Sequence, residues 1–79
     1  MSNSYIKSQI EKAINSKSAI EISYRNFDGT STIRRISNIK YNNKFRVEGY
    51  KDDHIDGYCH LRNEERTFKI ARINDIKIL

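Results

Sequence analysis

The apolar residues at the start of the chain follow the repeat of a helix. Between residues 3 and 17 they recur three or four positions apart, at Ile6, Ile10, Ala13 and Ile14. This spacing places them on one face of a helix whose other face is polar. It predicts one amphipathic helix over about 3–17, which would cover one end of the remaining chain.

Beyond residue 17 the apolar positions alternate with polar ones, which is typical of half-buried strands. Ile20, Ile22 and Tyr24 alternate in this way up to Asn26-Phe27-Asp28-Gly29, a turn sequence that tolerates positive φ. A return strand from about 32 to 41 would complete a hairpin.

The return strand departs from strict alternation. Ile33, Ile36 and Ile39 do not share one face of a regular strand, so we predict a bulge or bend near residues 35–37. Strongly bent strands are what a small barrel requires.

The second half of the chain predicts further strands over 44–50 and 55–61 and a final strand in two pieces, 67–73 and 75–79, with turns at 51–53 and at Asn63-Glu64-Glu65. In so short a chain, a partly closed barrel is an economical way to hide the edges of the sheet. The predicted fold is therefore mainly β (α+β): one N-terminal helix, then a strongly bent, five-stranded antiparallel β-barrel over about 19–79.

Composition fits one small domain. The chain has 79 residues, of which 37% are apolar; this fraction is low for a compact domain, but isoleucine occurs in every predicted element, which argues against disorder. The single cysteine, Cys59, cannot form an internal disulfide, and the N-terminus lacks the apolar core of a signal peptide. We therefore expect a cytoplasmic protein that does not contact a membrane.

The positive charge is concentrated in one segment. The formal net charge is +5, and no acidic residue occurs between Gly29 and Glu48. The basic residues of that segment are Arg34, Arg35, Lys40, Lys44 and Arg46. Aromatic residues are interleaved with them, which favours a partner with phosphates and bases. The alternative is that these are ordinary solvent-facing cations on strands.

The stretch from Gly57 to Ile73 adds a second group of cations. A hairpin there would bring Arg62, Arg66 and Arg72 near the rings of Tyr58 and His60. The alternative role of these arginines is structural pairing with acidic residues. The candidates for such pairing are Glu48, Glu64, Glu65 and Asp75.

Metal binding and catalysis are not indicated. Asp52, His54, Asp56 and His60 have ligand chemistry, but the first lies in a predicted turn and a bend would split the set. No Ser-His-Asp or Cys-His arrangement stands in a recognisable context, no Gly-rich phosphate loop occurs, and Cys59 is expected to face the core. We expect no enzyme activity, no metal and no cofactor.

The stretch from Gly57 to Ile73 resembles the WYL domain, a small Sm-like β-barrel module of bacterial and phage regulators. The matching elements are Tyr58-Cys59, Arg66-Thr67-Phe68 and Arg72-Ile73, with Ala13-Ile14, Ile22-Ser23-Tyr24, Asp28-Gly29 and Arg34 upstream. The resemblance implies that Arg34, Arg66 and Arg72 bind a nucleic-acid or nucleotide-like effector. The chain differs from the family pattern at three places. The Trp-Tyr-Leu triplet that gives the family its name is Asp53-His54-Ile55 here. Asn38 stands in place of a proline, and Ala71 stands in place of an acidic residue.

Two functions are consistent with these observations. The first is a non-catalytic regulatory module that binds single-stranded DNA or RNA, or a nucleotide-like effector. In it Arg34, Arg66 and Arg72 converge, Tyr58 provides the stacking ring, and Arg35, His60 and Arg62 contribute at the margin. The second is a protein-interaction module that contacts an effector protein or a second copy of itself. In either case we expect Asp53-His54 to be a solvated turn outside the ligand site.

Overall fold

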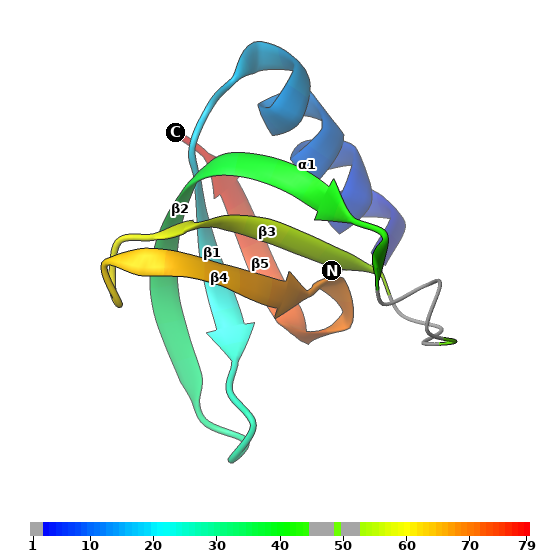
Figure 1. The fold of residues 1–79 in the computed structure, drawn as a ribbon. Coiled ribbons are helices and arrows are strands. Elements are labelled where there is room, and N and C mark those ends of the chain that lie inside the picture. Colours follow the sequence, from blue (N-terminus) through cyan, green and yellow to red (C-terminus); the bar gives the residue numbers. More distant parts are fainter. Residues whose placement is uncertain (1–2, 45–48, 50–52) are drawn as a thin grey trace.

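The computed structural model describes residues 3–44, 49 and 53–79. The elements in chain order are α1 (Asn3–Ser16), β1 (Ile20–Arg25), β2 (Ser31–Asn42), β3 (His54–Cys59), β4 (Glu64–Lys69), the 3-10 helix η1 (Ile70–Arg72) and β5 (Ile73–Ile78), as Figure 1 shows. The predicted N-terminal helix and the mainly β class are confirmed. The strand predicted over 44–50 falls largely on residues outside the described ones.

Helix α1 ends through a specific pattern of backbone hydrogen bonds. The N–H of Ser18 donates to the Ala13 carbonyl at 2.9 Å and that of Lys17 to the Ile14 carbonyl at 3.2 Å, with Lys17 at φ 54°. This is the Schellman arrangement, which satisfies carbonyls that the last turn would otherwise leave free. The chain can therefore leave the helix and enter β1 within three residues.

The five strands form one antiparallel sheet in the order β4-β3-β2-β1-β5. Strands β4 and β5 lie at opposite edges of this order, yet only η1, three residues long, separates them in the chain. The sheet must therefore bend until its two edges approach, and Figure 1 shows the long β2 curving to achieve this.

The predicted barrel is an overstatement, because the sheet bends strongly but does not close. Among the described strands, β4 pairs with β3 and β5 pairs with β1, and no pairing joins β4 to β5. The strand predicted over 67–73 is confirmed for residues 67–69, which belong to β4, but it is interrupted at residues 70–72. The chain turns away from the sheet at Ile70–Arg72, which places Arg72 on η1 rather than on a strand.

The predicted irregularity in β2 is present, slightly later than expected. The register between β2 and β3 shifts between Ser37 and Lys40, and Asn38 has φ 53°. Proline, whose ring fixes φ near −65°, could not adopt this conformation. Because the bulge adds a residue, Arg34 and Ile36 before it and Ile39 after it all face the interior.

The core lies between the concave face of the sheet and α1 (Figure 1). The helix packs against β5, β2 and η1. Its contribution is Ile6, Ile10 and Ala13, the face that the sequence predicts, and all three are fully buried. The sheet contributes a layer of isoleucines together with Cys59 and Phe68.

Gly57 sets how closely β3 approaches β2. A Cβ atom at this position would clash with Cγ2 of Ile36 and come within 3.1 Å of the Ser37 carbonyl oxygen. Both neighbours are rigid: Cγ2 is attached to a branched Cβ, and the carbonyl belongs to the sheet. The clash could be relieved only by separating the two strands.

We predict that Gly57→Ala lowers the free energy of unfolding by about 1–3 kcal/mol, as overpacking of a core does. Urea denaturation followed by circular dichroism measures this change. The control is the same substitution in an Ile36→Ala background, where the main clash is absent and the added cost of Gly57→Ala should be smaller. Equal costs in the two backgrounds would contradict this account of Gly57.

Candidate functional site

A cavity of about 340 Å³ lies between the β1–β2 hairpin, β4 and η1. Four arginines line it: Arg34, Arg62, Arg66 and Arg72. Three aromatic rings line it as well: Tyr24, Phe27 and Phe68. Asp28 is the one acidic residue of its lining. Four guanidinium groups against one carboxylate make this cavity strongly electropositive.

Strand register explains why these side chains share one face. Arg66 lies opposite Gly57, and Phe68 lies opposite Ile55. Arg34 lies opposite Ile22. Gly57, Ile55 and Ile22 are all buried. Because side chains directly opposite one another point to the same face, the two arginines and the phenyl ring are directed to the interior side of the sheet.

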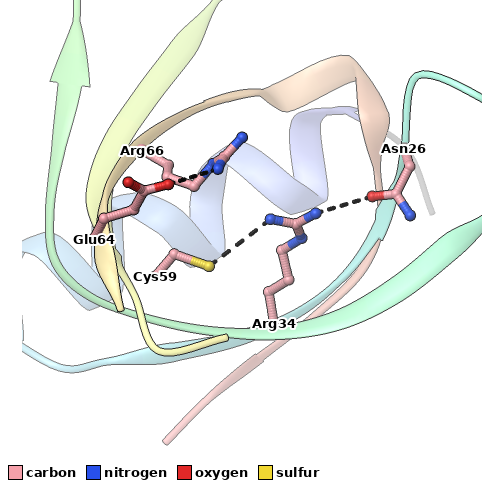
Figure 2. Close-up of polar contacts among 5 residues, drawn as sticks. All are labelled: Asn26, Arg34, Cys59, Glu64 and Arg66. Atoms are coloured by element: carbon pink, nitrogen blue, oxygen red, sulfur yellow. Dashed lines mark hydrogen bonds and ion pairs between the residues drawn. The ribbon is translucent and has the colours of Figure 1, made fainter. Parts of the chain in front are cut away.

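Arg34 lies deepest in the cavity, with only 6% of its surface exposed. Its Nε donates to Thr32 Oγ1 at 3.0 Å, its Nη2 to Asn26 Oδ1 at 3.0 Å, and its Nη1 to Cys59 Sγ at 3.8 Å. Figure 2 shows the guanidinium held between Asn26 and Cys59. The acceptors are a hydroxyl oxygen, an amide oxygen and a thiol sulfur, and none of them is a carboxylate. The hydrogen bonds therefore orient the guanidinium group without neutralising its charge.

Two aromatic rings complete the surroundings of Arg34. Its guanidinium carbon lies 5.6 Å from the ring centre of Tyr24 and 5.7 Å from that of Phe68. The rings meet edge to face, with 5.1 Å between their centres. The negative faces of aromatic rings attract cations. Within the described residues Arg34 forms no ion pair, so its positive charge stays available to an anion.

Among the residues that the structure describes, Arg66 is the cavity arginine that has a carboxylate partner. Its Nη1 lies 2.8 Å from Oε1 of Glu64, two residues earlier on the same strand (Figure 2). Glu64 is one of the partners expected for a structural arginine. Both side chains are about half exposed, and ion pairs between exposed groups contribute little stability. A phosphate can therefore compete with Glu64 for this guanidinium.

Arg72 and Arg62 differ from Arg66 because they have no carboxylate partner among the described residues. The guanidinium carbon of Arg72 lies 5.5 Å from the ring centre of Phe27. Neither Arg72 nor Arg62 forms an ion pair with another residue that the structure describes. Three of the four cavity arginines, these two and Arg34, are thus without a described carboxylate partner.

The carboxylate of Asp28 is occupied by its own turn. Its Oδ1 accepts hydrogen bonds from the hydroxyl of Thr30 at 2.7 Å and from the backbone N–H of Thr30 at 3.0 Å. These bonds, the hydroxyl first, hold the pKa of Asp28 below its usual value. The ionised group shapes the hairpin and leaves the guanidinium groups in excess.

Three of the predicted site residues lie elsewhere. Tyr58 pairs with Ser37 and with Glu65, so its side chain is on the face opposite to that of Gly57 and Arg66. There its ring meets that of His60 at 4.9 Å between centres. His60 is turned toward Ser37, with 3.0 Å between Nε2 and the hydroxyl oxygen. The expectation that Tyr58 and His60 lie beside the arginines is therefore wrong, because neighbouring residues of a strand point to opposite faces.

Arg35 also lies on the outer face, opposite Glu21, and its Nη2 is 4.0 Å from Glu21 Oε1. The acid-free basic segment is therefore not one surface patch. Lys40 lies 3.8 Å from Glu65, while Arg34 points into the cavity. Arg46 lies outside the described residues.

The cavity rings Tyr24, Phe27 and Phe68 were not among the site residues that the sequence analysis named. Phe68 is also part of the core, with 1% of its surface exposed, and Tyr24 packs against that core. The available signal was the hairpin register: in a hairpin closed at residues 26–29, Tyr24 and Arg34 have the same parity about the turn and so share a face.

Asp53 and His54, which stand where the family has Trp-Tyr, do not form the solvated turn that we expected. The Asp53 carbonyl accepts the N–H of Ile70 at 3.0 Å, and the Asp53 carboxylate pairs with Nζ of Lys7. His54 is the first residue of β3, opposite Asn42 on one side and Lys69 on the other. Both residues are half-buried, and both lie outside the arginine cavity.

Comparison with known proteins identifies the family. The model of the WYL domain matches residues 6–78. The chain belongs to the WYL domain family. Membership supports a regulatory, ligand-sensing module in general terms. A search of curated proteins found no match.

Among solved structures, Proteasome accessory factor B/C (PafBC) of Arthrobacter aurescens is similar to this chain, with a TM-score of 0.80 at 15% sequence identity. The match covers 96% of this chain and 11% of that chain. At 15% sequence identity the likeness shows a shared fold and carries no conclusion about function. Within the part of the chain that the structure describes, no helix is both long and apolar enough to span a bilayer, and no three candidate metal ligands cluster.

The buried charge of Arg34 leads to a stability prediction. Replacement by methionine keeps an unbranched side chain of similar length and removes a cation that lacks a described counter-charge. Since apolar replacement of buried ions is often neutral or stabilising, we predict that Arg34→Met unfolds at a urea concentration no lower than that of the parent. Arg34→Ala, which leaves a void, should lose about 2–4 kcal/mol. Equal losses in the two variants would show that the charge itself stabilises the fold.

Proposed function

We propose that this WYL domain is a non-catalytic sensor whose arginine cavity binds a phosphate group of single-stranded nucleic acid or of a nucleotide-like effector. The observation that carries the proposal is the excess of guanidinium groups. Four arginines line the cavity, and Arg34, Arg62 and Arg72 have no carboxylate partner among the described residues. A site built in this way is complementary to a polyanion.

The chemistry of guanidinium suits phosphate. Its planar fork donates two parallel hydrogen bonds to a pair of phosphate oxygens. Arg34, oriented by Asn26 and Thr32, presents a fixed donor at the base of the cavity. Arg66 would exchange its 2.8 Å contact with Glu64 for a contact with the ligand. We expect this exchange to be the first rearrangement of the protein on binding.

The lining of the cavity supports binding rather than catalysis. Its described residues include neither histidine nor cysteine, and its one carboxylate, Asp28, is engaged by Thr30. Such a lining offers no general base or nucleophile with a neighbour to activate it. A role in regulation agrees with family membership and with the fold shared with PafBC, which is named as an accessory factor. We place this activity in the cytoplasm, and it requires no cofactor.

A protein-interaction or oligomerisation module is the second candidate, because the open sheet leaves β4 and β5 at its edges. The exposed residues of β4 include Glu64, Glu65 and Arg66. Charged side chains on an edge strand oppose pairing with another strand. We therefore favour ligand binding, and the salt dependence of binding separates the two functions.

We predict that Arg66→Ala weakens binding of a short single-stranded oligonucleotide by about 1–3 kcal/mol and reduces the salt slope by about one unit, because one phosphate contact is lost. Fluorescence anisotropy at several salt concentrations measures both quantities. The matched control is Arg35→Ala, which removes the same charge from the outer face and should leave affinity nearly unchanged.

Arg34→Met provides a second test, since it should abolish most binding while the protein remains folded. Unchanged affinity and salt slope in Arg66→Ala would contradict the proposal. An equal loss in Arg35→Ala would show that binding depends on net charge and not on the cavity.

A further inference from the structure

Phe27 is the most exposed large apolar side chain of the described residues, with 92% of its surface accessible. It lies in the turn between β1 and β2, where the chain reverses at Asn26 to Gly29. Leaving a phenyl ring in water forgoes the stabilisation that its burial would provide. The central positions of such a turn accept most residue types, so the turn does not require a ring here.

The turn that carries Phe27 is fixed by hydrogen bonds. Asn26 N–H donates to the Thr30 carbonyl at 2.6 Å, and Gly29 N–H donates to the Asn26 carbonyl at 3.0 Å, with Gly29 at φ 90°. Asp28 accepts the two bonds from Thr30 described above. The ring is therefore attached to a backbone with little freedom.

The same turn is tied to the base of the cavity. Asn26 Oδ1 accepts Nη2 of Arg34 at 3.0 Å and also the hydroxyl of Thr32 at 3.2 Å. Phe27 itself lines the cavity. The ring and the deepest guanidinium thus belong to one hydrogen-bonded unit, so their separation is set before any ligand arrives.

Arg72 adds a cation above the ring. Its guanidinium carbon lies 5.5 Å from the ring centre of Phe27, although η1 and the β1–β2 turn are far apart in the sequence. Most of the ring surface remains open to solvent. A flat ring beside an Arg without a described carboxylate partner is the arrangement on which unpaired nucleobases stack.

We infer that Phe27 and Arg72 form a stacking platform for one unpaired nucleobase at the rim of the cavity, while Arg34 and Arg66 bind an adjacent phosphate inside. This inference rests on the proposed function and narrows it. The ligand must carry an exposed base next to a phosphate. The domain therefore prefers single-stranded nucleic acid or a nucleotide to a polyanion without bases, such as inorganic polyphosphate.

A fluorescent substitution reports stacking directly. The chain contains no tryptophan, so Phe27→Trp places a unique indole at the platform. We expect a short single-stranded oligonucleotide to quench its emission on binding, and inorganic polyphosphate to leave the emission largely unchanged. Quenching of equal size by both ligands would overturn the inference.

Removal of the ring gives a quantitative test. We predict that Phe27→Ala weakens oligonucleotide binding about 5- to 150-fold, as loss of one stacked base does, with an unchanged salt slope and unchanged affinity for polyphosphate. Phe27→Leu should lose nearly as much and Phe27→Tyr should retain binding, because planarity rather than apolar area is required. The matched control is Ile33→Ala, which truncates another exposed side chain, 63% accessible, on the outer face.

The outcomes separate this inference from the proposed function. If the parent binds oligonucleotide and Phe27→Ala binds it equally well, the platform is refuted while the arginine cavity stands. If the parent binds neither oligonucleotide nor polyphosphate, both proposals fail. If Phe27→Ala alters only self-association in analytical ultracentrifugation, the ring is a protein contact and the inference is overturned.

Discussion

The buried guanidinium of Arg34 is the constraint around which this domain is arranged. It occupies a position on the interior face of β2 that would otherwise take an aliphatic side chain, between Tyr24 and Phe68. A cation at this position loses its hydration shell. The described contacts that replace it are a hydroxyl, an amide oxygen, a thiol and the faces of two aromatic rings, none of which is an anion. The core of isoleucines must supply enough stability to tolerate it. Under the proposed function, an anionic ligand would supply the missing counter-charge.

The bend of the sheet converts this local chemistry into a cavity. Arg34, Arg66 and Arg72 belong to three separate elements, β2, β4 and η1, and in a flat sheet they would lie far apart. Here η1 joins the two edge strands, and the bulge at Asn38 lets β2 continue across both halves of the sheet. The arginines consequently surround one volume. The same bend leaves the edges of β4 and β5 unpaired, and the charges on β4 limit its ability to add another strand.

The cavity combines fixed and exchangeable cations. Arg34 is immobilised by the hydrogen bonds of the β1–β2 hairpin, whereas Arg66 is held by a half-exposed contact with Glu64. A ligand that displaces Glu64 changes the charge at the start of β4, next to the turn that leads back to β3. Under the proposed function, the contact that would change on binding therefore lies at the β3–β4 end of the sheet, and the contacts of Arg34 with the β1–β2 hairpin would be kept.

The sequence alone determined the elements whose patterns are local. The 3.6-residue repeat of Ile6, Ile10 and Ala13 specified α1, and alternation specified β1 and the irregular β2. It also indicated three arginines that line one cavity, because Arg34, Arg66 and Arg72 match the family pattern. Tertiary structure decided which rings accompany them. Tyr58 is one residue away from the position that would have placed it beside Arg66, and a strand reverses its side chains at every residue. Parity across strands depends on register and on where a bulge adds a residue, and both follow from packing of the whole sheet rather than from any short stretch of the chain.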